Sequence, residues 1–150
     1  MKVFESVDDM RTAIGEHLGY SDWHTVTQAQ ISMFAEATGD HQWIHVDPEA
    51  AAKGPFGTTI AHGYLTLALI PMLVSQVSRV DGVRMGVNYG LNKVRFPAPV
   101  PVGSRVRAGV RLKSVEDIEG GAQIINEITI EREGGDKPSC VAETVARYYL

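Results

Sequence analysis

The sequence has few of the features that mark secreted, membrane-spanning and thiol-dependent proteins. It has one cysteine, Cys140, so a disulfide within the chain is excluded, and a lone cysteine in a strand-like run is typical of an unreactive core residue. The longest apolar run, Tyr64 to Val74, contains Thr66 and Pro71 and is too short to cross a bilayer. The N-terminus has no apolar stretch of the kind found in signal peptides. We therefore expect a cytoplasmic protein with no membrane partner.

Positive charge is also scarce. The 14 lysine and arginine residues are outnumbered by 18 aspartate and glutamate residues, and no basic block occurs, which argues against nucleic acid as a partner. No glycine-rich phosphate-binding loop and no Gly-x-Ser-x-Gly nucleophile motif is present. The composition is otherwise that of a globular protein, 44% hydrophobic without an internal repeat or linker, and it predicts one domain over residues 1–150.

Helix signals fill the first part of the chain. Thr27 followed by Gln30 matches a capping box, and Gly39 suits the left-handed residue that ends a helix, so we expect a helix over residues 28–38. The next segment, residues 40–46, has neither helical nor strand periodicity, and we interpret it as a loop.

A buried helix and a sheet are predicted in the rest of the chain. Residues 62–76 are apolar on almost every side, so this helix must be covered by other structure, and Pro71 predicts a kink within it. After Val83 the pattern changes to alternation, most clearly over residues 105–113, where four basic residues and Gly109 alternate with apolar residues. We expect an α+β fold in which a curved antiparallel sheet wraps around a long apolar central helix. The predicted strands are residues 83–89, 93–96, 105–113, 123–132 and 140–149.

Asp40 and His45 are the first candidates for chemistry. They lie five residues apart, close enough for both side chains to hold one water molecule or one substrate proton. An acid and an imidazole are the minimum set for adding or removing water, because one group takes a proton while the other delivers one. The alternative is structural: Asp40 caps the backbone near Gly39, and His45 is a hydrogen-bonded loop residue.

His62 and Gly63 begin the apolar helix and form a second candidate element. Gly63 has no side chain to exclude a ligand, and its N–H at the helix start could hold the carbonyl oxygen of a thioester. The alternative is a glycine that permits tight packing. A metal site of His41, His45 and His62 with Asp40 is disfavoured because no His-x-x-x-His pair sits on a predicted helix and no cysteine pair occurs, so we expect no metal.

Together these residues resemble the MaoC-like family of (R)-specific enoyl-CoA hydratases, which have the hot-dog fold. The family motif has an aspartate, then Asn-Pro two and three residues later, and a histidine five residues after the aspartate. Asp40 and His45 keep that spacing, within the Gly-Asp-His-Gln-Trp-Ile-His form that is usual in the single-domain mycobacterial and NodN-like subgroup. The resemblance covers most of the chain, and the other matching segments are Val46–Ala51, Ile60–Gly63 and Asn88–Phe96.

The resemblance implies a reversible addition of water to a trans-2-enoyl-CoA, giving an (R)-3-hydroxyacyl-CoA. Asp40 and His45 match the catalytic pair, and Gly63 matches the backbone donor to the thioester oxygen, with His62 and Gln42 expected beside the substrate. No cofactor is implied beyond the coenzyme A of the substrate, and family members are usually homodimers whose sheets join edge to edge.

The chain departs from the family pattern at two places. Gln42-Trp43 replaces Asn-Pro, and Pro71 stands where some members have a serine on the central helix.

Two other functions remain open: a hot-dog acyl-CoA thioesterase and a non-catalytic acyl-CoA-binding module. The Asp40/His45 spacing together with His62-Gly63 favours hydration over thioester hydrolysis. Several basic residues could neutralise coenzyme A phosphates or could equally form a solvated strand face: Lys93, Arg95, Arg105, Arg107, Arg111 and Lys113.

Overall fold

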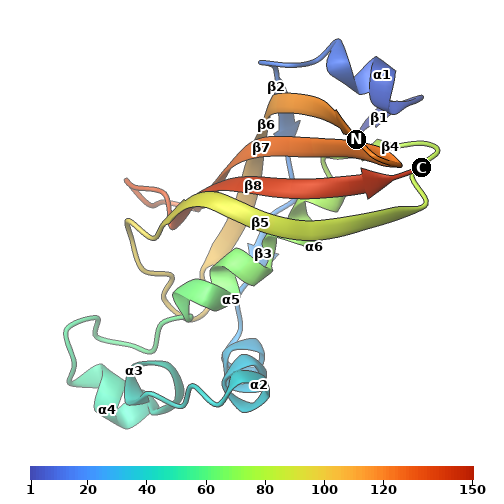
Figure 1. The fold of residues 1–150 in the computed structure, drawn as a ribbon. Helices are drawn as coiled ribbons and strands as arrows, with labels where there is room; N and C mark the ends of the chain where they lie inside the picture. Colours follow the sequence, from blue (N-terminus) through green and yellow to red (C-terminus); the bar gives the residue numbers. More distant parts are fainter.

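A six-stranded antiparallel sheet forms one layer of the computed structural model, which describes residues 1–150 (Figure 1). The strands lie in the order β2-β6-β7-β8-β5, and the short β3 also pairs with β6. A separate pair of parallel strands joins β1 (Lys2–Phe4) to β4 (Ser78–Val80). The strands of the large sheet are β2 (His17–Tyr20), β3 (His24–Thr25), β5 (Met85–Arg95), β6 (Arg105–Ile118), β7 (Gly121–Arg132) and β8 (Cys140–Tyr149).

Six helices complete the fold. α5 and α6 run along one face of the sheet, and α2, α3 and α4 lie together beyond the start of α5 (Figure 1). No helix combines the length and the apolarity needed to cross a bilayer. The helices are α1 (Val7–Arg11), α2 (Gln28–Thr38), α3 (Trp43–Val46), α4 (Pro48–Ala52), α5 (Gly63–Ala68) and α6 (Ile70–Ser75).

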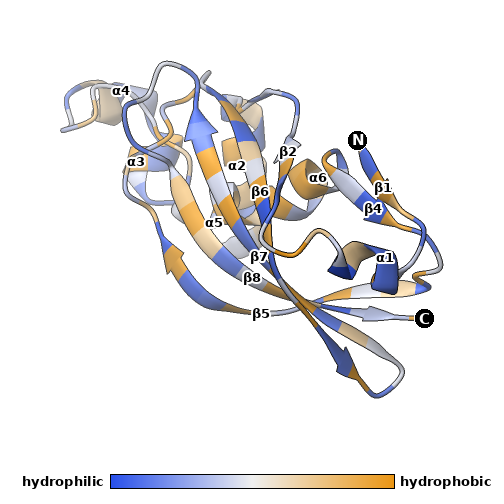
Figure 2. Cartoon of the chain, turned by 90° about the horizontal axis from the view of Figure 1, so that it is seen from above, coloured by the Kyte–Doolittle hydropathy of each residue, from blue (hydrophilic) through white to orange (hydrophobic).

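Alternation along β6 and β7 creates the core face of the sheet, as the sequence predicts. Every second residue of these strands points toward the helices, and apolar and polar residues alternate along them in Figure 2. The fully buried residues are Val106, Ala108, Val110 and Leu112 of β6 and Ile124, Ile128 and Ile130 of β7. The α+β prediction with an antiparallel sheet is therefore confirmed.

The central helix is shorter than expected. It divides at Leu69 into α5 and α6, which have six residues each. Pro71 lies in the first turn of α6 and has no N–H, so the helical hydrogen bond back to the Leu67 carbonyl cannot form. The predicted break is present two residues before Pro71, and the expectation of one long helix is wrong.

The segment before the central helix differs from the prediction in one respect. The helix over residues 28–38 is confirmed as α2: the Thr27 hydroxyl accepts from the N–H of Gln30, and Gly39 has a φ of 80° at the C-terminal end. The predicted loop over residues 40–46 is wrong in its second half, because Trp43–Val46 forms the single helical turn α3. Four residues are too few to produce a periodic pattern in the sequence.

Strand β5 is an exposed edge strand. It pairs with β8 on one side only and runs without a break through Gly90, where the register shifts, so the prediction of two separate strands is wrong. Met85, Val87, Tyr89 and Leu91 are exposed along it. One stripe of the central helices is exposed as well, so a single chain does not cover this helix on all sides. The stripe consists of Tyr64, Ala68, Pro71, Met72 and Ser75.

Candidate active site

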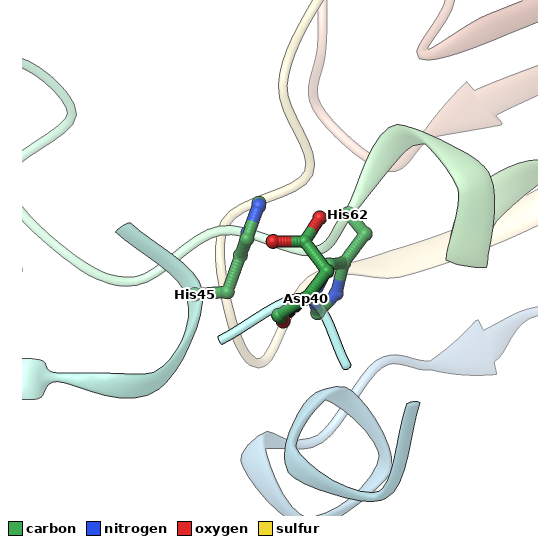
Figure 3. Close-up of side chains that lie close together, drawn as sticks. All are labelled: Asp40, His45 and His62. Atoms are coloured by element: carbon green, nitrogen blue, oxygen red, sulfur yellow. Dashed lines mark hydrogen bonds between the residues drawn. The ribbon is translucent and has the colours of Figure 1, made fainter. Parts of the chain in front are cut away.

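Three titratable side chains meet between α2, α3 and the start of α5. A carboxylate oxygen of Asp40 and one ring nitrogen each from His45 and His62 lie within 4.8 Å of one another. Asp40 follows the glycine that ends α2, His45 is on α3, and His62 immediately precedes α5 (Figure 3). The cluster brings together residues that are 22 positions apart in the sequence.

The end of α2 places Asp40. Gly39 adopts the left-handed conformation, and its N–H donates to the Ala35 carbonyl at 2.8 Å, so the chain leaves the helix at this point. The Asp40 carbonyl oxygen then accepts from Nε2 of His62 at 3.0 Å, and the carboxylate accepts from the N–H of Gln42 at 3.4 Å. Because the Asp40 side chain remains exposed, its carboxylate is open to a ligand.

His45 is buried, and its tautomer follows from its partners. Nδ1 lies 2.7 Å from the Ile60 carbonyl oxygen, which can only accept, so Nδ1 carries the hydrogen. In the neutral ring Nε2 then has a free lone pair, as a general base needs. The His45 carbonyl oxygen accepts from Nε2 of Gln28 at 2.9 Å, and Oε1 of Gln28 accepts from the Thr59 hydroxyl at 2.6 Å. Two contacts from outside α3 therefore hold its histidine.

His62 lies behind the other two groups. Its ring stacks on that of His45 with the centroids 3.8 Å apart, and Phe34 packs near its ring at 4.9 Å. Only 2% of His62 is exposed, its Nε2 donates to Asp40, and its Nδ1 is buried without a hydrogen-bond partner. The residue therefore contacts both Asp40 and His45 and does not itself face the solvent.

The stacked geometry bears on metal binding. The three groups are near enough to be ligands, but a metal ion binds an imidazole nitrogen in the plane of its ring. The two ring planes are inclined by only 23°, so a point close to both free nitrogens cannot lie in both planes. The arrangement suits a water molecule hydrogen-bonded by the carboxylate and one imidazole better than a bound ion.

Gly63 serves a packing role in the structure. An added Cβ would lie 3.1 Å from the Phe96 ring, which is closer than an ordinary contact. Gly63 is also the first residue of α5, so its N–H has no partner within the helix. The structure is thus compatible with both interpretations of Gly63, a tightly packed glycine and a backbone donor to a thioester oxygen. Gln42, the other predicted neighbour of the substrate, precedes α3, is exposed, and makes no side-chain capping bond.

A cavity of about 820 Å³ lies between the central helices and strands β5 and β8. Its lining includes Leu67 and Ala68, about one turn along α5 from Gly63, and Pro71 and Val74 of α6, but none of Asp40, His45, His62 and Gly63. Of its 20 lining residues, 11 are hydrophobic, so the cavity suits an apolar chain more than a charged one.

Most of the basic residues on β6 already have partners on the neighbouring strands. Arg105 pairs with Glu133, and this hydrogen bond raises the pKa of Arg105 and lowers the pKa of Glu133. Arg107 pairs with Glu131. Lys113 likewise pairs with Glu143, and Arg111 donates to the Gly15 carbonyl. Lys93 and Arg95 on β5 have no acidic partner.

Cys140 is fully buried, and burial raises the pKa of its thiol to about 11. Since the thiolate is the nucleophile, a neutral buried thiol is unreactive. The prediction of a core cysteine is confirmed.

Sequence reasoning missed four residues that hold the site: Gln28, Thr59, Ile60 and Phe34. Gln28 follows the capping residue Thr27, and nothing local reveals that its amide reaches His45. Ile60 contributes only a backbone carbonyl, which no sequence pattern encodes. The burial of a threonine such as Thr59 is the one signal available, and it appears only once the fold is known.

The chain is similar to several known proteins over most of its length. Residues 9–133 match the family model described as MaoC like domain. The chain is 62% identical over 149 residues to 3-hydroxyacyl-thioester dehydratase Z of Mycobacterium tuberculosis (strain ATCC 25618 / H37Rv), covering 99% of both chains. It is 44% identical to nodulation protein N of Rhizobium leguminosarum bv. viciae, covering 93% of this chain and 89% of that protein.

Among solved structures, the (R)-hydratase from A. caviae involved in PHA biosynthesis superposes with a TM-score of 0.69. It has 25% sequence identity, and the match covers 89% of this chain and 94% of the hydratase.

Proposed function

The chain belongs to the MaoC-like dehydratase family with the hot-dog fold, and on this premise we propose that it is a hydro-lyase that interconverts 3-hydroxyacyl and 2-enoyl thioesters. In one direction water adds to a trans-2-enoyl-CoA to give an (R)-3-hydroxyacyl-CoA, and in the other it is eliminated. The observation that carries the proposal is that a carboxylate oxygen of the exposed Asp40 lies within 4.8 Å of a ring nitrogen of His45, whose Nδ1 is already paired with the Ile60 carbonyl.

In this proposal Asp40 and His45 are the catalytic residues. They hold one water molecule between them, and one group takes a proton from it as the water oxygen bonds to C3 of the enoyl chain. The proton taken from the water is then passed to C2, so the pair returns to its starting protonation state over a full cycle. The hydrogen bond from Nδ1 of His45 to Ile60 keeps Nε2 available as an acceptor, which supports the role of His45 as a base.

The thioester oxygen gains negative charge as water adds to C3, and it needs a donor. The N–H of Gly63 is unpaired within α5 and is proposed to supply it. We assign His62 a positioning role, because its ring is buried against His45 and its Nε2 holds the Asp40 carbonyl. The backbone N–H of Gln42, in place of the family asparagine, holds the Asp40 carboxylate.

The cavity beside α5 and α6 is proposed to take the acyl chain, because it starts one helical turn from Gly63 and is mainly apolar. Lys93 and Arg95 are the better candidates for the coenzyme A phosphates, since three of the four basic side chains on β6 already pair with glutamates. No cofactor is required, because the thioester itself acidifies the carbon that exchanges its proton.

A homodimer is the proposed assembly. Strand β5 has an unpaired edge and exposes Met85, Val87, Tyr89 and Leu91, and the exposed stripe of the central helices lies near it. A second copy that pairs along β5 would satisfy the open backbone groups and cover apolar surface that a single chain leaves in water.

Crotonyl-CoA tests the reaction directly. Loss of the enoyl absorbance without release of free thiol is the expected result. Release of thiol would identify a thioesterase, and binding without turnover would identify an acyl-CoA-binding module; either result would overturn the proposal.

A further inference from the structure

A polar side chain interrupts the apolar floor of the cavity. Asn126 lies on β7 in the series of core-facing positions that also includes Ile124 and Ile128, and it is 6% exposed. Its cross-strand neighbours are Leu112 on β6 and Thr144 on β8. Strand β7 is a middle strand of the sheet, and α5 and α6 run along one face of that sheet (Figure 1).

The Asn126 amide is not satisfied by the protein. Its Oδ1 is buried and has no hydrogen-bond partner, although Asn126 lines the cavity. Thr144 also lines the cavity, and its hydroxyl makes only a 3.5 Å contact with the Asn126 carbonyl. A buried amide without a partner destabilises the fold, and a leucine of similar size would avoid that cost. The position therefore suits a ligand group that completes the amide's hydrogen bonds.

We propose that Asn126, with Thr144 beside it, is a specificity-determining subsite for acyl chains that carry a hydroxyl group beyond the reacting carbons. A keto oxygen could accept a hydrogen bond from Nδ2 but would leave the acceptor Oδ1 unpaired. A hydroxyl both donates and accepts, and so it pairs with the amide whichever way the amide is oriented. This inference rests on the proposed function, because it takes the cavity to be the acyl-chain site.

The extent of the cavity along the helices limits which acyl chains can enter it. Leu67 and Pro71 line the cavity four and eight residues after Gly63, which corresponds to roughly 6 and 12 Å along the helices. A four-carbon chain held at Gly63 therefore ends before the middle of the cavity, whereas a ten-carbon chain reaches it. Crotonyl-CoA consequently reports on the reaction alone, and longer chains report on the subsite.

The test compares trans-2-decenoyl-CoA with analogues of the same length that carry one hydroxyl on successive carbons from C6 to C10. The wild-type protein should prefer one position over the plain chain by roughly ten-fold in kcat/KM, because only that analogue pairs the buried amide. Asn126→Leu should abolish this preference, measured as the ratio of kcat/KM for the hydroxylated and the plain ten-carbon chain on the same variant. Asn126→Ala provides a second variant in case leucine perturbs the fold.

Ser75→Ala is the matched control. Ser75 lines the same cavity, but its hydroxyl already donates to the Met72 carbonyl at 2.6 Å, so its removal should leave the preference intact. A wild-type protein that hydrates crotonyl-CoA but shows no preference at any hydroxyl position would overturn the inference, as would a preference that survives in both Asn126 variants. If crotonyl-CoA is not hydrated, the proposed reaction fails instead. Calorimetry then tests the subsite by itself, by comparing the Kd of saturated decanoyl-CoA with the Kd of its hydroxylated analogues. A roughly ten-fold tighter Kd for one hydroxyl position supports the subsite, and equal Kd values overturn it.

Discussion

Replacing Gln28 by leucine should weaken both the fold and the site. The substitution removes the bond from Gln28 Nε2 to the His45 carbonyl, at 2.9 Å, and the bond from the Thr59 hydroxyl, at 2.6 Å. Thr59 is 2% exposed, so water cannot replace the lost partner. Each buried group left unpaired costs about 1–3 kcal/mol, and we expect the free energy of unfolding to fall by roughly 2–4 kcal/mol.

Urea unfolding measures this loss. With a slope of about 1–3 kcal/mol per molar urea, the midpoint should fall by roughly 1–2 M. The kcat for crotonyl-CoA should also drop by about ten- to a hundred-fold under conditions where the variant is folded, because His45 is no longer held in place. Gln30→Leu is the matched control on the same helix: its amide contacts only His24, so midpoint and kcat should stay close to the wild-type values.

A double-mutant cycle separates the hydrogen bond from general damage. Thr59→Val removes the other partner, and a Gln28→Leu/Thr59→Val double variant leaves neither group of that bond unpaired. The double variant should therefore lose at least about 1 kcal/mol less than the sum of the single variants. Additive losses, or a Gln28→Leu midpoint equal to that of the wild type, would refute the reasoning.

Four further outcomes follow from the structure. Asp40→Asn and His45→Gln should each lower kcat for crotonyl-CoA by about 10²–10⁴-fold while thermal unfolding changes little. Gly63→Ala places a methyl group beside the proposed thioester donor and 3.1 Å from a partly exposed ring that can move, so kcat/KM should fall while the free energy of unfolding changes by less than about 1 kcal/mol. Leu91→Arg should shift the mass measured by light scattering from dimer toward monomer, because it places a charge on the exposed β5 edge. Burial raises the pKa of Cys140 from 9.0 to about 11, so the thiol of the unfolded chain ionises at a lower pH than the thiol of the folded protein. The free energy of unfolding should therefore be unaffected below about pH 9 and should fall by about 2 kcal/mol as the pH rises to 11.

Each of these outcomes has a clear contradiction. Near-normal turnover in Asp40→Asn or His45→Gln would remove that residue from the chemistry. An unfolded Gly63→Ala protein would mean that packing alone explains the glycine. A wild-type chain that is monomeric at micromolar concentration would contradict the edge-strand assembly. Cys140→Ala is the control for the pH series, and an identical loss of stability in that variant would assign the effect to other groups.

Local patterns in the sequence predict the elements that are stabilised locally. The alternation around Arg105 becomes β6, and the Thr27 cap and the Gly39 terminator become the two ends of α2, since each signal depends on residues a few positions apart. The error at Gly90 has the opposite cause. A glycine was interpreted as the end of a strand, but pairing with β8 carries β5 through it as an irregularity in register.

The site was predictable only in part. Asp40 and His45 could be found because their spacing is a motif, and His62-Gly63 because it opens an apolar helix. The stacking of His62 on His45 and the reach of Gln28 to α3 are tertiary contacts between segments 17 positions apart, and no periodicity encodes them. The unpaired amide of Asn126 was equally hidden, because an asparagine in an alternating strand reads as an outward-facing residue until its neighbours are known.

The one-turn helix α3 has a practical consequence for heat tolerance. A single turn is unstable in isolation, so the geometry of His45 depends on its contacts with Gln28 and Ile60. These contacts can open while the sheet stays folded, and activity would then disappear at a lower temperature than the one at which the β-sheet melts. Better packing of the core that covers β6 and β7 would raise the melting temperature of the sheet. It would not raise the temperature at which activity is lost. A heat-tolerant catalyst requires substitutions around Gln28 and Thr59.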